Sequence, residues 1–257
     1  MDHRRAVLFD AAGTLIELRE PVGETYARIA REYEVTVSPR KLEAAFRVTF
    51  KAAPAMAFPG VSLGEVPRLE KAWWRQVVSK TFQTADPAAK FPDFDGFFEN
   101  LFDVMGRPQT WREIPGARSL LLRLRSLRWT TAIVSNFDRR LPEILQGLGL
   151  AELFDAIVLC SDVGAAKPDP AIFHHALDRL QVSAAQAVVV GDDEALDIAG
   201  ARAAKIRAIH LSSLAKLDGL VDQLVALPDF PGERVGGVRG VGGVGGVGGV
   251  GGSDHGE

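Results

Sequence analysis

Five short apolar runs, rich in β-branched residues, recur along this chain and restrict its fold more than any other feature. Continuous apolar runs of this length are typical of strands buried on both faces, as in a parallel sheet. Longer segments with apolar residues at helical spacing separate them, so we predict an α/β fold with a sheet between helical layers. The strands are expected at residues 6–9, 130–134, 156–159, 187–190 and 207–211, and the intervening helices at 117–127, 139–148, 170–180 and 195–204.

The stretch between the first two expected strands breaks this alternation. Residues 17–112 hold amphipathic helical patterns and no clear strand, which predicts a helical cap inserted into a core of residues 1–16 and 113–228. Its aromatic residues can line a substrate pocket or pack inside the cap, and packing is the favoured interpretation. The cap helices are expected at 22–33, 39–51, 66–82 and 94–104, and the aromatic residues are Phe46, Phe50, Trp73, Trp74, Phe82, Phe97 and Phe98.

Composition and charge exclude several classes of protein. The 257 residues carry a formal net charge of -3, so no basic field indicates nucleic acid. No apolar run approaches the ~18 residues of a membrane span, and the run before Asp10 is too short for a signal peptide. We therefore expect a cytoplasmic protein without membrane partners, of open oligomeric state. The Gly-Gly-Val repeat within residues 229–257 is expected to be disordered, because it buries too little side chain to offset its backbone entropy.

The single cysteine, Cys160, lies beside an apolar run and allows no intrachain disulfide, which fits a reducing compartment. No histidine is near it in the sequence, so we interpret it as a buried core thiol and not as a nucleophile.

Polar residues that can handle a phosphoryl group follow three of the expected strands. Asp10 follows the first, and Gly13 lets the chain turn tightly there, so its carboxylate can attack phosphorus. The hydroxyl and amide of Ser135 and Asn136, after the second, can hold phosphoryl oxygens. Lys167 is followed by prolines that stiffen the backbone around it, and its cation can neutralise phosphate and carboxylate charge gathered in one site.

Gly191-Asp192 and Asp197 follow the fourth expected strand. Several carboxylates at one place repel each other unless a cation is present, and Mg²⁺ prefers such oxygen ligands. Each motif alone also has an ordinary explanation: a turn aspartate, a helix cap, a solvated lysine or an acidic helix N-terminus. Their order along the chain makes the functional interpretation the stronger one.

These motifs, in this order, resemble those of the haloacid dehalogenase (HAD) superfamily, in its class with a helical cap after the first motif. The similarity spans residues 6 to about 212 and implies a Rossmann-like three-layer α/β core with an inserted α-helical cap. Within it, residues 21–26, Trp73-Trp74 and residues 137–140 resemble the rhythmically-expressed-gene-type subgroup. The supporting runs are 10–15, 135–141, 148–150, 154–155, 161–164 and 167–173.

The resemblance implies a role for each motif residue in a Mg²⁺-dependent phosphatase or phosphotransferase acting on a small phosphorylated metabolite. Asp10 is the implied nucleophile, with Ser135 and Lys167 acting on the phosphoryl oxygens. Asn136, Gly13 and Thr14 complete the expected substrate-binding set. The expected Mg²⁺ ligands are Asp10, the backbone carbonyl of Ala12 and Asp192, with Asp197 close behind.

The sequence departs from the family pattern at two positions. Lys205 stands where a glycine is usual. Ala12 stands where a second aspartate usually protonates the leaving oxygen and then activates water, so general acid–base catalysis, typically worth about 10²–10⁴-fold, is expected to be weakened.

Ala12 leaves other interpretations open. A metal-free 2-haloacid dehalogenase also lacks the second aspartate, and Arg40 or Arg47 could hold its halide. A phosphonoacetaldehyde hydrolase also has alanine there, but no motif around Lys41, Lys51 or Lys71 provides its Schiff-base lysine. A non-catalytic HAD-fold protein that binds a phosphorylated ligand is the remaining alternative.

Overall fold

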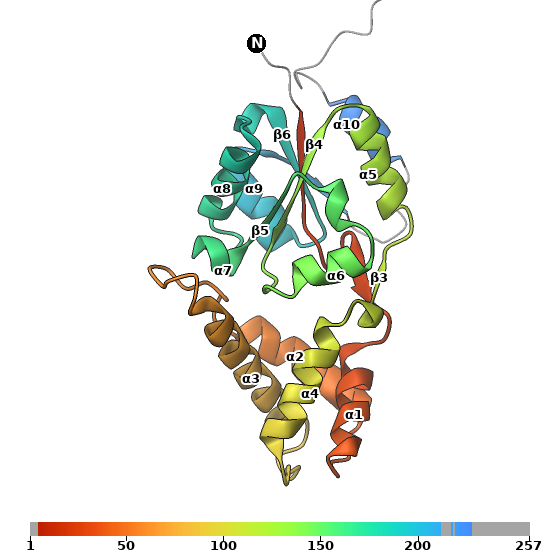
Figure 1. Cartoon of the computed structure of the whole chain (residues 1–257), viewed down its shortest axis with the longest axis vertical. Coiled ribbons are helices and arrows are strands. Elements are labelled where there is room, and N and C mark those ends of the chain that lie inside the picture. Colours follow the sequence, from red (N-terminus) through yellow and green to blue (C-terminus); the bar gives the residue numbers. More distant parts are fainter. Residues whose placement is uncertain (1–4, 212–216, 218, 228–257) are drawn as a thin grey trace, which may run out of the picture.

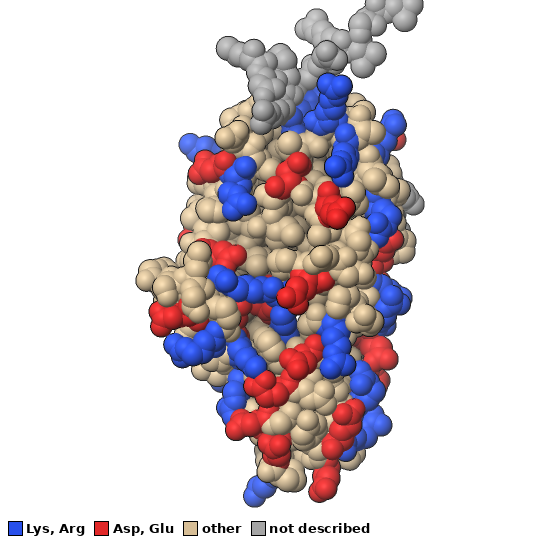
Figure 2. All heavy atoms as spheres, viewed as in Figure 1, with Lys and Arg blue, Asp and Glu red and all other residues tan. Residues whose placement is uncertain are grey.

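A computed structural model of the chain describes residues 5–211, 217 and 219–227 (Figure 1). The Gly-Val repeat, with the disorder expected for it, lies outside the described residues. No helix among the described residues is both long enough and apolar enough to span a membrane. Acidic and basic side chains lie interspersed over the face of the molecule in Figure 2.

A five-stranded parallel sheet forms the centre of the core, in the order β5-β4-β1-β6-β7. β1 is its middle strand, and Phe9 is in register with Ile133 on one side and Val190 on the other. The carboxyl ends of β1, β4 and β6 therefore meet at one edge of the sheet. The strands are β1 (Ala6–Phe9), β4 (Thr130–Ser135), β5 (Ala156–Leu159), β6 (Ala187–Gly191) and β7 (Arg207–His210), which confirms the five that the apolar runs predict.

Helices cover both faces of the sheet and complete the three layers of the predicted α/β core. One face packs on α5 (Ala117–Ser126), α6 (Leu141–Gly147) and α10 (Leu220–Val225). The other packs on α8 (Pro170–Leu180) and α9 (Ala199–Ala203), as Figure 1 shows. The side chains of β1 alternate between the two faces of the sheet. Val7 and Phe9 pack on one face, and Ala6 and Leu8 pack on the other. Short helical turns complete the core at Ala151–Leu153, Cys160–Val163 (α7) and Ala184–Gln186.

The helix expected at 195–204 is not continuous. It begins as a turn of π-helix, η4 (Glu194–Ile198), and continues as α9. The carbonyl of Asp193 accepts from Ile198 N–H at 3.3 Å, five residues on, while its side chain accepts from Ala195 N–H at 2.8 Å. The wider turn follows β6 directly and carries Asp197 into the core, where it is 1% exposed.

Four helices form the cap: α1 (Val22–Glu32), α2 (Pro39–Ala52), α3 (Val66–Ala85) and α4 (Phe94–Gly106), with a 3₁₀ turn at Pro108–Thr110. They share an apolar cluster of their own that includes Tyr26, Phe82 and Phe97. The expectation of no strand in this stretch is wrong. Antiparallel β2 (Ile16–Leu18) and β3 (Trp111–Glu113) pair where the chain enters and leaves the cap. Each is three residues long, too short for alternation to reveal.

Candidate active site

Asp10 lies directly after β1, at the carboxyl edge of the sheet. Its N–H donates to the carbonyl of Val190 at 2.9 Å, which fixes it beside β6. The chain then turns at Gly13, whose φ is +95°. A Cβ at Gly13 would lie 2.5 Å from Oδ2 of Asp192. Glycine is therefore required both by the backbone conformation and by the approach to Asp192.

Lys167 is the cation of the site and is 5% exposed. Its Nζ donates to Oδ1 of Asp10 and to Oδ1 of Asp197, at 2.6 Å each. Burial alone would lower the pKa of Lys167, but the attraction of the two carboxylates outweighs burial and raises that pKa. The lysine is therefore protonated at neutral pH and ties β1 to η4.

Asn136 holds this lysine in place. Its Oδ1 accepts from the Lys167 N–H at 2.8 Å, and its Nδ2 donates to the Lys167 carbonyl at 3.0 Å. Both polar atoms of the Asn136 side chain are thus hydrogen-bonded to the backbone of Lys167. Its expected direct contact with phosphoryl oxygens stays a prediction, and the positioning of Lys167 is the role that the structure adds.

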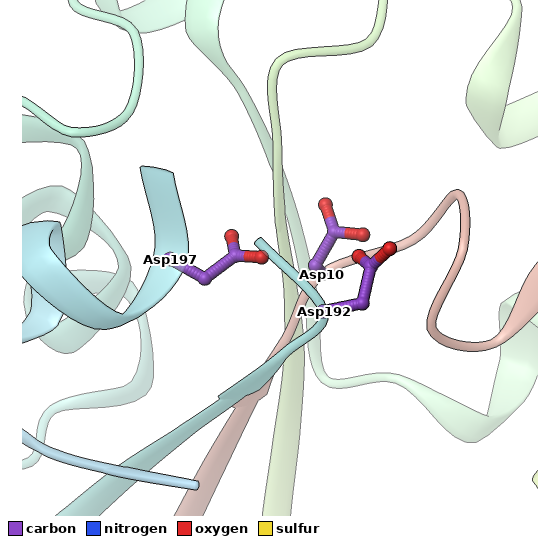
Figure 3. A group of neighbouring side chains, drawn as sticks. All are labelled: Asp10, Asp192 and Asp197. Atoms are coloured by element: carbon purple, nitrogen blue, oxygen red, sulfur yellow. The ribbon is translucent and has the colours of Figure 1, made fainter. Parts of the chain in front are cut away.

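Three carboxylates gather at this edge of the sheet. One oxygen each of Asp10, Asp192 and Asp197 lies within 4.8 Å of the others. Figure 3 shows Asp10 and Asp192 side by side at the strand ends, with Asp197 approaching from its helix. Oδ2 of Asp197 accepts from Asp193 N–H at 3.1 Å, so both of its oxygens have protein partners. Asp10 and Asp192 are therefore the better placed pair for an external ligand.

The charges of these carboxylates are not fully compensated. Burial raises the pKa of Asp10, Lys167 offsets this only in part, and Asp192 adds repulsion. Partial burial, together with repulsion from Asp197, raises the pKa of Asp192, and burial and repulsion from Asp10 raise the pKa of Asp197. Excess negative charge on hard oxygen donors is the environment that a divalent cation such as Mg²⁺ fits.

The remaining predicted residues surround this centre. Thr14 Oγ1 donates to Oδ1 of Asp192 at 3.3 Å and so orients that carboxylate. Ser135 ends β4, is 3% exposed, and its Oγ accepts from Phe137 N–H at 3.3 Å. Ala12 is exposed in the turn after Asp10, and its backbone bridges to Ile16.

A cavity of about 690 Å³ lies between cap and core and reaches the site at Ala12, Gly13 and Asp192. Both roles considered for the aromatic residues of the cap occur: Phe82 and Phe97 pack in the apolar cluster of the cap, whereas four others line the cavity. Amphipathic spacing identifies the apolar face of a helix but cannot tell whether that face meets another helix or a cavity. The residues concerned are Phe46, Phe50, Trp74 and Phe98.

The motif after Asn136 attaches the cap to the core, a role that the sequence analysis missed. Asp138 is 1% exposed and accepts from Trp74 Nε1 of α3 at 2.6 Å. It also accepts from Nε and Nη2 of Arg140, at 2.8 and 2.6 Å. Arg140 in turn donates to the carbonyl of Phe102 in α4 at 2.8 Å. The only available signal was the position of residues 137–140 directly after Ser135-Asn136.

Glu70 makes a second attachment between cap and core. It lies on α3, is 3% exposed, and accepts from Ser161 Oγ of α7 and from Arg139 N–H at 3.4 Å. Burial raises the pKa of Glu70, and the charge of Asp138 raises it further. Cys160 beside it is buried as expected, and burial raises the pKa of this thiol to about 12.

Comparison with known proteins identifies the family. The protein-family model described as haloacid dehalogenase-like hydrolase matches residues 4–205 of the sequence. Haloacid dehalogenase-like hydrolase domain-containing protein 3 of Mus musculus is 40% identical over 86% of this chain and 88% of its own length. The rhythmically expressed gene 2 protein of Drosophila melanogaster is 28% identical over 68% of this chain and 69% of its own length. Both the family and the subgroup suggested by the motifs are thereby confirmed.

Solved structures with this fold include a phosphatase and a dehalogenase. A HAD phosphatase from Thermococcus onnurineus is 23% identical, with TM-score 0.58 over 86% of this chain and 97% of that one. The putative HAD-hydrolase YfnB from Bacillus subtilis, bound to magnesium, is 17% identical, with TM-score 0.62 over 81% and 89%. L-2-haloacid dehalogenase from Xanthobacter autotrophicus is 21% identical, with TM-score 0.61 over 86% and 82%. These likenesses show the fold, and with the family match they establish that the chain belongs to the haloacid dehalogenase-like hydrolase family.

Proposed function

We propose that this chain is a Mg²⁺-dependent phosphohydrolase that acts on a small phosphorylated metabolite through a phosphoryl group carried on Asp10. The observation that carries the proposal is the contact of a buried, protonated lysine with Asp10 beside two further carboxylates. A nucleophile, a cation for the phosphoryl oxygens and a site for a divalent cation then lie at one strand end. We place this activity in the cytoplasm, with no nucleic-acid or membrane partner.

The chemistry has two displacements at phosphorus. A carboxylate oxygen of Asp10 attacks the phosphorus, the bond to the ester oxygen breaks, and that oxygen leaves with its electron pair and takes a proton from solvent. Water then attacks the phosphorus of the acyl phosphate and loses a proton. The bond to Asp10 breaks, which releases inorganic phosphate and restores the carboxylate. Lys167 and Ser135 are proposed to hold the phosphoryl oxygens in both steps.

Asp10, the carbonyl of Ala12 and Asp192 are proposed to hold Mg²⁺, with Asp197 behind them. The bound ion supplies a positive charge that attracts the phosphoryl oxygens and offsets the repulsion between the carboxylates. Support comes from the oxygen cluster with its raised pKa values, and from the magnesium-bound Bacillus protein of the same fold.

Ala12 supports one further candidate function. Without the carboxyl group expected there, the protein can bind a phosphorylated ligand and turn it over slowly or not at all. The dehalogenase alternative has less support. Arg40 does not line the cavity, Arg47 lines it but forms an ion pair with Glu43, and the carboxylate cluster favours a cation.

The test is hydrolysis of para-nitrophenyl phosphate and acetyl phosphate, with and without Mg²⁺, beside an Asp10→Asn variant. Phosphate release that needs both Mg²⁺ and Asp10 is the expected result. A folded protein that binds a phosphate analogue without turnover would support the ligand-binding alternative. Halide release from 2-haloacids without Mg²⁺ would replace the proposal with dehalogenation.

A further inference from the structure

Resting on the proposed function, we infer that the substrates of this enzyme are aryl phosphates, in which the phosphoryl group is carried on a phenolic oxygen. The inference combines two independent observations. One is that aromatic side chains line the cavity. The other is that the carboxyl groups lining it are already hydrogen-bonded to other groups of the protein.

The wall of the cavity selects for an aromatic group. Half of the cap-helix residues that line it are aromatic: Tyr26, Phe46, Phe50, Trp74, Phe98 and Phe102. Phe46 stacks on Phe50, and Phe50 stacks on Trp74, at centroid distances of 5.2 and 5.8 Å. Aromatic rings favour offset-stacked and edge-to-face partners, which a planar ligand ring can provide.

The two arginines on this wall already have hydrogen-bond partners within the protein. Arg140 is bound by Asp138 and by the carbonyl of Phe102. Nε of Arg47 donates to Glu43 at 3.2 Å. A sugar phosphate needs hydrogen-bonding partners for its hydroxyl groups, and a wall of this kind meets them mostly with rings. At about 690 Å³ the cavity falls within the range that holds a drug-sized ligand, which a small haloacid would leave largely unfilled.

The carboxyl groups that line the cavity are those of Glu17, Glu43 and Asp192, and each has another partner or role. Asp192 accepts from Thr14 Oγ1 and is a proposed Mg²⁺ ligand, so none of the three is free to protonate a leaving oxygen. Ala12 provides only a methyl group at the point where the cavity meets the site. Glu17 accepts from Arg112 Nε at 2.8 Å. Glu43 accepts from Gly23 N–H at 2.9 Å as well as from Arg47.

A leaving group that needs no proton fits such a site. A phenol has a pKa of about 10, so a phenolate departs unprotonated far more readily than an alkoxide. The missing acid and the aromatic wall therefore select the same class of ester, one whose leaving group is both planar and weakly basic.

The first test compares esters that differ in one property at a time. 2-Naphthyl phosphate and 2-(2-naphthyl)ethyl phosphate share their rings but release a phenolate and an alkoxide, respectively. We expect kcat/KM to be about 100-fold higher for the aryl ester, the scale of a general-acid contribution. Phenyl phosphate should fall below 2-naphthyl phosphate, and glucose 6-phosphate should fall below both. Equal values for the naphthyl pair, or a preference for glucose 6-phosphate, would overturn the inference.

The second test uses variants of the cap. Phe50→Ala removes a half-exposed ring of the wall, and Phe94→Ala removes a partly buried cap ring that does not line the cavity. We expect Phe50→Ala to lower the ratio of kcat/KM for 2-naphthyl phosphate to that for acetyl phosphate by about 3- to 10-fold, the scale of one aromatic pair. Phe94→Ala should not change this ratio. Equal ratios in the two variants would refute an aromatic binding wall.

Acetyl phosphate separates the two levels of the proposal, because it needs neither an aromatic pocket nor an acid. If Asp10-dependent turnover of acetyl phosphate occurs without an aryl preference, only the substrate inference fails. If no phosphate compound is turned over, the proposed function fails. Titration calorimetry with phosphonates then tests whether the cavity binds an aromatic group. Tighter binding of 2-naphthylmethylphosphonate than of methylphosphonate would support aromatic recognition, and equal binding would contradict it.

Discussion

Ala12 presents a methyl group at the junction of the cavity and the carboxylate cluster. The variant Ala12→Asp returns an acid to this position, whereas Ala12→Asn matches its shape without the acid. We expect Ala12→Asp to raise kcat for 2-(2-naphthyl)ethyl phosphate by about 100-fold, and kcat for 2-naphthyl phosphate much less. Steady-state phosphate release measures both. Equal rates for the aspartate and asparagine variants would show that acid catalysis is not what the site lacks.

Lys205 adopts a left-handed backbone conformation, with φ of +60° after α9. This conformation costs a residue with a Cβ about 1 kcal/mol or more, but costs glycine very little. We therefore expect Lys205→Gly to raise the free energy of unfolding by about 1 kcal/mol and Tm by about 2–4 °C. Lys205→Ala is the control, since it removes the side chain but keeps the Cβ, and it should leave Tm near that of the parent chain. Equal gains in both variants would indicate a side-chain effect instead.

At the scale of single residues, the sequence predicts which polar residues gather at the sheet edge better than it predicts their hydrogen bonds. Asp10, Asp192 and Lys167 each follow a strand or precede a helix, so the parallel sheet brings them to one edge. The link from Asn136 to the backbone of Lys167 spans 31 residues, and no local pattern reveals it. The departure at Lys205 is visible in the sequence only against the family pattern, and the structure gives it a cost.

The helix α3 carries Glu70 into the contact between cap and core, with Asp138, Arg139 and Ser161 around its carboxyl group. Because its folded pKa lies above the unfolded value, protonation stabilises the folded state. That contribution is complete below about pH 4.5 and is lost as pH rises through the raised pKa. We expect Glu70→Gln, which stays neutral, to become more stable relative to the parent chain as pH rises above about 4.5.

Urea unfolding of both proteins between about pH 4.5 and 8 isolates this effect, because all other titrating groups are common to the two. Glu34→Gln, at an exposed position of the cap, is the control and should show no such trend. A constant difference between Glu70→Gln and the parent chain across this range would contradict burial as the cause of the raised pKa.

Elements were predictable to the extent that their residues follow a period. The expected helix at 170–180 coincides with α8, and each apolar run is a strand. The split of the helix expected at 195–204 into η4 and α9 depends on hydrogen bonds of Asp193 that spacing does not encode. Which of the cap's aromatic residues line the cavity could not be predicted for a related reason, because it depends on how the cap helices pack against one another.

At the scale of the whole molecule, three carboxylates gather beside Lys167, and its single positive charge does not balance theirs. Any ligand that binds only the folded state stabilises it, by about 2.7 kcal/mol at about 100-fold above its Kd. We expect Mg²⁺ to raise Tm of the parent chain, and Asp192→Asn to abolish this gain. Without Mg²⁺, Asp192→Asn should be at least as stable as the parent chain, because one repelling carboxylate is gone. Scanning calorimetry with Mg²⁺, and with K⁺ at matched ionic strength, measures both.

An equal gain in Tm for Asp192→Asn and the parent chain would place the ion elsewhere. A gain of the same size with K⁺ would show a general salt effect and no specific site.

The central claim is that the phosphoryl group passes through Asp10, and trapping it there tests the claim most directly. The protein is mixed with Mg²⁺ and acetyl phosphate that carries the radiolabel in its phosphoryl group, and the reaction is quenched in acid. The labelled peptide is then sequenced by mass spectrometry. The label should appear on Asp10 and be absent in Asp10→Asn. It should also persist longer than in Ala12→Asp, because that variant gains a carboxyl group that can activate water. Phosphate release without label on Asp10, or label that survives in Asp10→Asn, would contradict the account.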